Sequence, residues 1–119
     1  MMIKFYQYPN CTTCKKAAKF LSDNGVSFEP IDITQHTPTK EEFRQIIQKS
    51  DLEIKKFFNT HGAKYKELNL KDRLGEMSDE EKLELLASDG MLVKRPLAVS
   101  GDTVTVGFKE ADYRDIWVS

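Results

Sequence analysis

The sequence predicts an α/β fold, with a four-stranded mixed sheet, helices packed on it and an inserted helical lobe. A strand–helix–strand pattern occupies residues 3–33, and a β-hairpin pattern lies near residue 100. Only helical patterns occur between them, over about residues 37–90. Because 119 residues leave no room for two independent cores, we expect a single domain over residues 1–119.

The N-terminal pattern is a βαβ unit. Ile3 to Tyr8 is short and rich in aromatic and β-branched residues, which is typical of a buried strand. A helix is predicted over about Thr12 to Asn24, and a second strand over Ser27 to Ile33, where Pro30 favours a position at the sheet edge. This order within about 30 residues predicts two parallel strands.

The helical lobe carries two clear helix starts. Thr37-Pro38-Thr39 precedes Glu41-Glu42, and Ser78-Asp79-Glu80-Glu81 resembles a capping box. Shorter helical pieces are predicted over 52–58 and 65–70, with a turn between them and a stop at residues 89–90. The chain then returns to a hairpin around residues 100–102 and a last helix over about 109–117.

Composition excludes several classes of protein. Lys and Arg number 18 and Asp and Glu 19, and a net charge of −1 argues against direct nucleic-acid binding. No apolar run reaches the roughly 18 residues of a membrane span, and the N-terminus lacks a secretory signal pattern. We therefore expect a cytoplasmic protein without a membrane partner.

Cys11 and Cys14 form a Cys-x-x-Cys motif where the first strand meets the first helix. A thiol at a helix N-terminus faces unpaired backbone N–H groups and the positive end of the helix dipole, which favour the nucleophilic thiolate. We expect Cys11 to be the exposed nucleophile and Cys14, one turn further on, to resolve a mixed disulfide.

Two other interpretations of the cysteines remain open. They can be small buried hydrophobic residues, or half of a zinc site completed by His36 and His61. The spacing of these histidines matches no standard zinc finger, and we expect no metal and no organic cofactor.

The sequence Lys94-Arg95-Pro96 precedes the predicted hairpin. Together with Tyr8-Pro9-Asn10-Cys11-Thr12-Thr13-Cys14, the stretch 57–65 and Val106-Gly107-Phe108, it resembles the ArsC/Spx family of thioredoxin-fold, arsenate reductase-like proteins. The resemblance implies a thioredoxin-like fold with a cis peptide bond before Pro96. It implies that Arg95 takes part in catalysis, and that Asn10, Thr12 and Pro96 contact the substrate.

The resemblance implies two functions. The first is a thiol–disulfide oxidoreductase or arsenate reductase-like enzyme that exchanges with protein or glutathione thiols. Arsenate reductases bind the oxyanion with three arginines, but only Arg95 matches here, with Asn59 and Phe108 at the other positions. The alternative is an Spx-like redox-sensing regulator whose partner is the α subunit of RNA polymerase.

Overall fold

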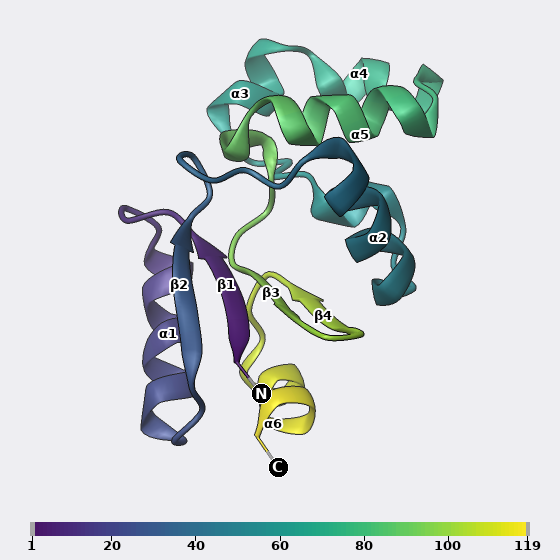
Figure 1. Ribbon diagram of the computed structural model, residues 1–119. Helices are drawn as coiled ribbons and strands as arrows, with labels where there is room; N and C mark the ends of the chain where they lie inside the picture. The colour runs from purple at the N-terminus through teal and green to yellow at the C-terminus, as the bar shows by residue number, and fades with distance from the viewer. Residues whose placement is uncertain (1, 119) are drawn as a thin grey trace. The chain divides into compact units, whose positions relative to one another are not determined.

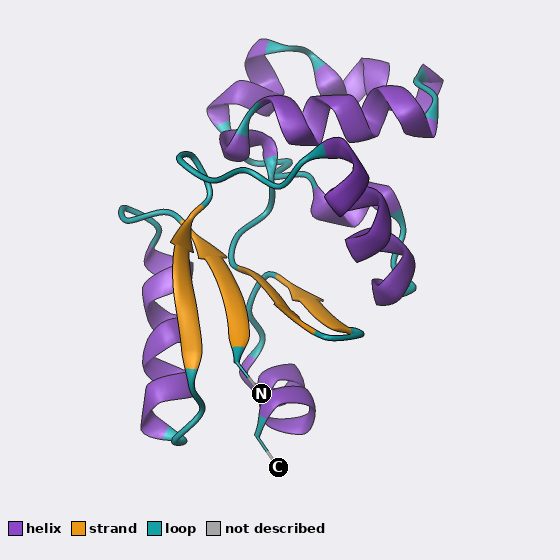
Figure 2. Cartoon of the chain, viewed as in Figure 1, coloured by secondary structure: helices purple, strands orange, loops and turns teal. Residues whose placement is uncertain are grey.

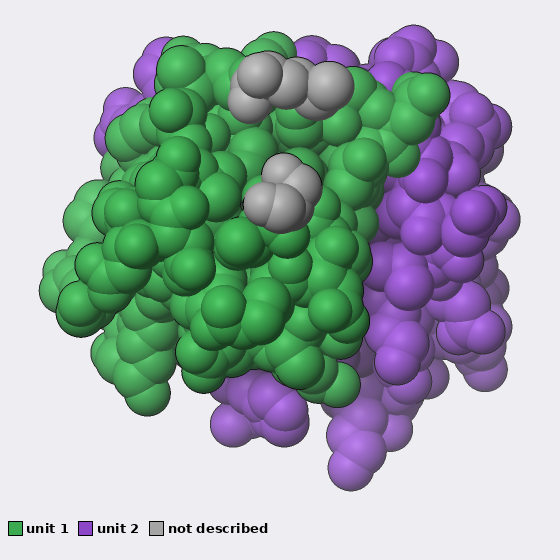
Figure 3. Space-filling view, turned by 90° about the horizontal axis from the view of Figure 1, so that it is seen from below, with its two compact units in different colours: residues 1–32, 95–119 green, residues 33–94 purple. Residues whose placement is uncertain are grey.

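The computed structural model describes residues 2–118 and divides into two compact units, which Figure 3 shows in different colours. Unit 1 comprises residues 1–32 and 95–119. Unit 2 comprises residues 33–94, which lie in the sequence between the second strand and the third. Each unit is described separately below.

Unit 1 contains the sheet and two helices (Figures 1 and 2). The N-terminal βαβ pattern and the late hairpin are both present, close to the bounds predicted from the sequence. The elements are β1 (Ile3–Gln7), α1 (Thr12–Asp23), β2 (Phe28–Asp32), β3 (Leu97–Ser100), β4 (Thr103–Val106) and α6 (Glu110–Trp117).

The four strands form one mixed sheet in the order β2-β1-β3-β4. β1 pairs in parallel with β2 and antiparallel with β3, and β3 continues into β4 through a tight hairpin in which Ser100 pairs with Thr103. The predicted fold class is therefore confirmed. β2 lies at the sheet edge, where Pro30, which has no backbone N–H, costs the ladder least.

Helices α1 and α6 pack on the sheet face that carries alternate residues of β1. Phe20 of α1 contacts the rings of Phe108 and Tyr113, and the Trp117 indole donates a 3.0 Å hydrogen bond to the Thr105 hydroxyl. These contacts hold the last helix against the sheet. The buried core of this face consists of Ile3, Phe5, Ala17, Phe20, Leu21, Ala98 and Tyr113.

Unit 2 is mostly helical, as its sequence predicts. None of the helices within residues 2–118 is long and apolar enough to cross a lipid bilayer. The elements of unit 2 are α2 (Lys40–Ser50), the 3₁₀ turn η1 (Ile54–Phe57), α3 (Ala63–Glu67), α4 (Leu70–Arg73), η2 (Leu74–Glu76), α5 (Asp79–Ser88) and η3 (Gly90–Leu92).

Both predicted helix starts in unit 2 have complete capping boxes. The Thr39 hydroxyl accepts from the Glu42 N–H at the start of α2, and the Ser78 hydroxyl accepts from the Glu81 N–H at the start of α5. In each box the glutamate also accepts from the backbone N–H of the capping residue. Four otherwise unpaired backbone donors are thereby satisfied.

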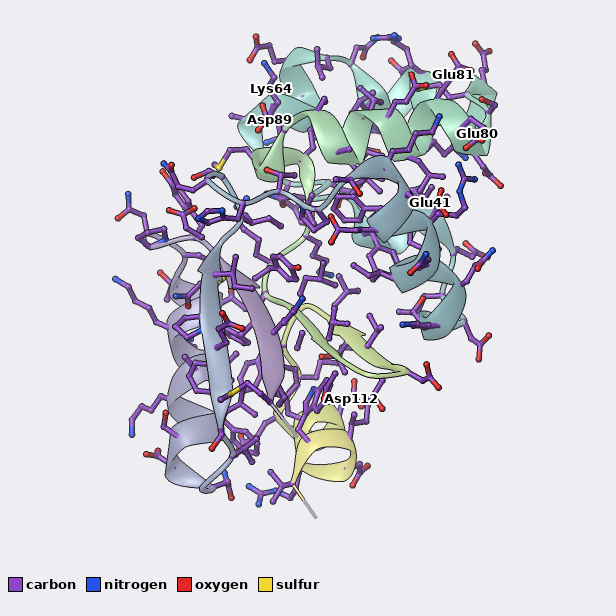
Figure 4. The ribbon with its side chains drawn as sticks, in the orientation of Figure 1. Glu41, Lys64, Glu80, Glu81, Asp89 and Asp112 are labelled. Atoms are coloured by element: carbon purple, nitrogen blue, oxygen red, sulfur yellow. The ribbon has the colours of Figure 1, made fainter. Side chains whose placement is uncertain are left out.

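Arg44 links the two capped helices through exposed ion pairs. Its guanidinium lies 3.0 Å from Glu41 on its own helix and 2.8 Å from Glu80 on α5; both glutamates are labelled in Figure 4. Because these side chains are solvated, their contribution to stability is small. The helix pair depends instead on buried apolar residues such as Phe43, Ile46 and Leu86.

The predicted helix over residues 65–70 is wrong in detail. The chain forms two short helices there, because Asn69 adopts a left-handed conformation with φ of 54° and interrupts the helical hydrogen bonds. The predicted stop at residues 89–90 continues directly into η3. The Asp89 carboxylate accepts from the Met91 N–H at 2.8 Å and caps that turn.

The two ends of unit 2 meet at Gly90. A Cβ atom there would overlap the backbone carbonyl oxygen of Ile33, so only glycine fits this close approach. The Ile33 carbonyl also accepts a hydrogen bond from the Thr37 hydroxyl. The start and the end of residues 33–94 are therefore packed against one another within the unit.

Replacing Ser78 by alanine should destabilise unit 2 by about 1 kcal/mol, since it removes the hydroxyl that accepts the Glu81 N–H at the start of α5. Urea unfolding followed by circular dichroism measures the loss. Ser22→Ala, which removes an exposed serine hydroxyl from α1, is the matched control and should leave the midpoint unchanged or slightly raised. Equal midpoints for Ser78→Ala and wild type would contradict the prediction.

Burial raises the pKa of Tyr113 to about 12. The unfolded chain then ionises this phenol near pH 10 while the folded chain keeps it neutral, so stability is full below pH 10 and falls as the pH rises toward 12. Between pH 7 and pH 11, the free energy of unfolding of Tyr113→Phe should fall by about 1 kcal/mol less than that of wild type, as measured by urea titrations. Parallel losses in both proteins would refute this linkage.

Candidate functional site

Cys11 is the N-cap residue of α1. Its backbone is extended, with φ of −89° and ψ of 111°, and its sulfur accepts the backbone N–H of Cys14 at 3.2 Å. The Cys11 N–H donates to the Tyr8 carbonyl at 3.0 Å, which turns the chain from β1 into the helix. Cys11 is partly exposed, and its sulfur lies at the N-terminal end of α1.

Cys14 lies one turn further along α1 and has no exposed surface. Burial raises the pKa of the Cys14 thiol to about 12, and a hydrogen bond to Cys11 and the charge of Cys11 act in the same direction. A backbone hydrogen bond from Tyr8 and the positive charge of Arg95 oppose this shift. Cys14 is therefore a protonated thiol beneath the accessible Cys11 sulfur, and both cysteines are free.

Arg95 and Pro96 belong to the same unit as the cysteines. The peptide bond between them is cis, as the sequence analysis expected, and Pro96 is buried, with its carbonyl accepting from the Gly107 N–H at 2.9 Å. The guanidinium carbon of Arg95 lies 5.5 Å from the centre of the Tyr8 ring. Its charge also acts on the Cys14 sulfur.

The other residues singled out in the sequence are distributed as follows. Asn10 and Thr12 are exposed and flank Cys11 at the start of α1. His36 and His61 are exposed and lie in unit 2, apart from the cysteines in the chain. Within residues 2–118, no three His, Cys, Asp or Glu side chains are grouped so that they could hold a metal ion.

Two features of this region were not evident from the sequence. The Tyr8 ring is half-buried, and the Arg95 guanidinium lies over its face. Phe108, which the resemblance places where an arginine is expected, packs edge-on against Tyr113 with ring centres 4.8 Å apart.

The comparison with known protein families matches residues 6–116 to the ArsC family. The chain belongs to the ArsC family. Among its relatives, the YusI protein of Bacillus subtilis is 54% identical over 98% of this chain and 99% of that protein. The regulatory protein MgsR of Bacillus subtilis is 31% identical over 92% of this chain and 86% of its own length.

Solved structures of the same kind cover almost the whole chain. A solution structure of a protein from Staphylococcus aureus is 69% identical, with a TM-score of 0.91 over 99% of this chain and 100% of that one. An arsenate reductase from Vibrio cholerae is 25% identical, with a TM-score of 0.85 over 98% of each chain. The proteins to which this chain is similar thus include one named an arsenate reductase and one named a regulatory protein.

The geometry predicts that iodoacetamide modifies Cys11 and spares Cys14 in the native protein. Because Cys14 is buried and its pKa is raised, we expect its alkylation at pH 8 to be slower by a factor of roughly 100 or more. Peptide mass spectrometry over time gives the two rates. Cys14→Ser should react like wild type and Cys11→Ser should resist until urea is added; equal labelling of both cysteines would contradict the buried position of Cys14.

Proposed function

We propose that this ArsC family protein is a cytoplasmic thiol–disulfide oxidoreductase in which Cys11 is the nucleophile and Cys14 the resolving thiol. One observation carries the proposal: the partly exposed Cys11 sulfur caps α1 by accepting the Cys14 N–H, while Cys14 is buried directly behind it. This gives the two thiols of one motif different accessibilities, as two successive exchange steps require.

In the first step the Cys11 thiolate attacks one sulfur of a substrate disulfide. A bond forms between Cys11 and that sulfur, the substrate S–S bond breaks, and the second substrate sulfur leaves as a thiolate. Cys11 lies at the N-terminal end of α1 and is partly exposed, so a disulfide can approach it.

In the second step Cys14 attacks the Cys11 sulfur of the mixed disulfide. The Cys14 proton passes to the departing substrate sulfur, which leaves as a thiol, and a Cys11–Cys14 disulfide remains. Once Cys11 is bonded to substrate it carries no charge, so two of the influences that raise the Cys14 pKa are removed. Two electrons have then moved from the protein to the substrate, and an external thiol such as glutathione or thioredoxin restores the reduced protein.

Arg95 and Pro96 complete the proposed site. The guanidinium supplies a positive charge close to the thiols and can pair with a carboxylate of a glutathione mixed disulfide. Pro96 shapes the approach, and the exposed Asn10 and Thr12 offer polar groups on either side of Cys11. The substrate class is therefore a protein disulfide or a glutathione mixed disulfide.

Arsenate is a less suitable substrate than a disulfide. A tetrahedral dianion needs several cations around it, and the position of one expected arginine is filled by Phe108, whose ring belongs to an aromatic cluster of unit 1. Asn59 provides an uncharged amide at the other position.

A second candidate function is a redox-sensing regulator that acts by contact with the α subunit of RNA polymerase. The similarity to the regulatory protein MgsR favours it, because MgsR matches 92% of this chain. In this case the Cys11–Cys14 disulfide is a switch between two binding states and not a step of turnover.

Replacing Cys14 by serine should trap the substrate. The first exchange still takes place, but no resolving thiol remains, so a mixed disulfide on Cys11 accumulates in cells by at least about tenfold over wild type. Non-reducing gels and mass spectrometry identify the attached molecule. The double variant Cys11→Ser/Cys14→Ser is the control and should capture nothing; an empty Cys14→Ser variant would refute the oxidoreductase mechanism.

The two functions are separated by one binding experiment. The purified protein, either reduced or oxidised, is immobilised and exposed to the purified polymerase α subunit. Capture that depends on the redox state supports the regulator. No capture, together with turnover of a glutathionylated peptide by wild type and none by Cys11→Ser, supports the enzyme.

A further inference from the structure

We propose that Tyr8 is a positioning residue that holds the Arg95 guanidinium beside the thiol pair, and that this arrangement selects disulfides carrying an anionic group near the S–S bond. The inference rests on the proposed function and concerns which substrates the Cys11 site accepts. It assigns a role to a residue that the motif Cys-x-x-Cys does not include.

The backbone of Tyr8 is tied to both cysteines. Its carbonyl accepts the Cys11 N–H at 3.0 Å, and its backbone hydrogen-bonds to the Cys14 sulfur. Tyr8 directly follows β1, which is paired on both sides within the sheet. The start of the Tyr8 side chain is therefore fixed relative to both sulfurs by the strand and by the turn into α1.

The ring of Tyr8 contacts Arg95 and so links its position to that of the Tyr8 backbone. The guanidinium carbon lies 5.5 Å from the ring centre, within the range of a cation–π contact. Both residues are only partly exposed, which lessens screening by solvent. A planar guanidinium stacked on an aromatic face loses much of its rotational freedom, so its charge stays at one place relative to the ring.

The positive charge of Arg95, placed in this way, acts on the Cys14 thiol. Against the larger effect of burial, the positive charge of Arg95 lowers the pKa of Cys14. A cation at such a distance also attracts an anionic group of an incoming molecule, whereas it has little effect on an uncharged one. The exposed Lys15 and Lys16 on α1 add a positive background that solvent screens more strongly.

The test compares a negatively charged with a neutral alkylating reagent at one sulfur. Iodoacetate and iodoacetamide react with Cys11 by the same substitution, so the ratio of their rate constants reports the local potential and cancels changes in thiolate content. The ratio is measured at low ionic strength by mass spectrometry of the Cys11 peptide. The variants are Tyr8→Ala, Tyr8→Leu, Tyr8→Phe, Arg95→Ala and Tyr8→Ala/Arg95→Ala, and far-ultraviolet circular dichroism verifies that each is folded.

We expect Arg95→Ala to lower the iodoacetate to iodoacetamide ratio about threefold or more, and Tyr8→Ala to lower it nearly as much. Tyr8→Phe should keep the wild-type ratio, because the aromatic face remains. The double variant should match Arg95→Ala alone, as expected for two residues acting through one contact. Lys16→Ala, which removes a positive charge from exposed α1, is the control and should change the ratio less.

The remaining outcomes overturn the proposal. A wild-type ratio in Tyr8→Ala, alongside a low ratio in Arg95→Ala, means that other contacts hold the guanidinium. A low ratio in Tyr8→Phe assigns the effect to the hydroxyl and not to the ring. If Tyr8→Ala does not fold, Tyr8→Leu, which keeps an apolar side chain without an aromatic face, decides in its place. None of these results touches the Cys14→Ser trapping experiment, so the oxidoreductase proposal is tested separately.

Discussion

The arrangement of unit 1 around its cysteines depends on one hydrogen bond, the donation of the Cys14 N–H to the Cys11 sulfur. The Cys11 sulfur is the N-cap acceptor of α1, a role that a serine or aspartate oxygen has at many helix starts. This bond marks the start of α1. Cys11 lies at the partly exposed end of the helix, and Cys14, one turn later, is buried in the core. The same hydrogen bond therefore starts the helix and places the proposed nucleophile at its end.

Local signals in the sequence were sufficient for most of the fold. The βαβ unit, the hairpin, the helix start before Glu41 and the capping box at Ser78 each depend on residues close together in the chain, and each is present in the structure. Asn69 was harder, because nothing in its neighbours distinguishes a left-handed residue that divides a helix from one that continues it. The choice there depends on packing within unit 2.

For the site, the sequence indicated which residues belong to it better than which of them contact one another. Cys11, Cys14, Arg95 and Pro96 could be named from motif and resemblance, because each has a characteristic type and spacing. The contact between Tyr8 and Arg95 joins residues separated by nearly the whole chain, and β1 and β3 bring them together. Such a contact follows from strand pairing and not from any local pattern, and the packing of Phe108 against the distant Phe20 is likewise not a local feature.

The meeting of Gly90 and Ile33 has a consequence for how this protein can be altered. A segment whose two ends touch can be excised and replaced by a short linker, since the flanking strands need not move apart or together to accommodate it. Residues 33–94 are therefore a segment that can be exchanged for another one, while the unit that contains the sheet and the cysteines is retained.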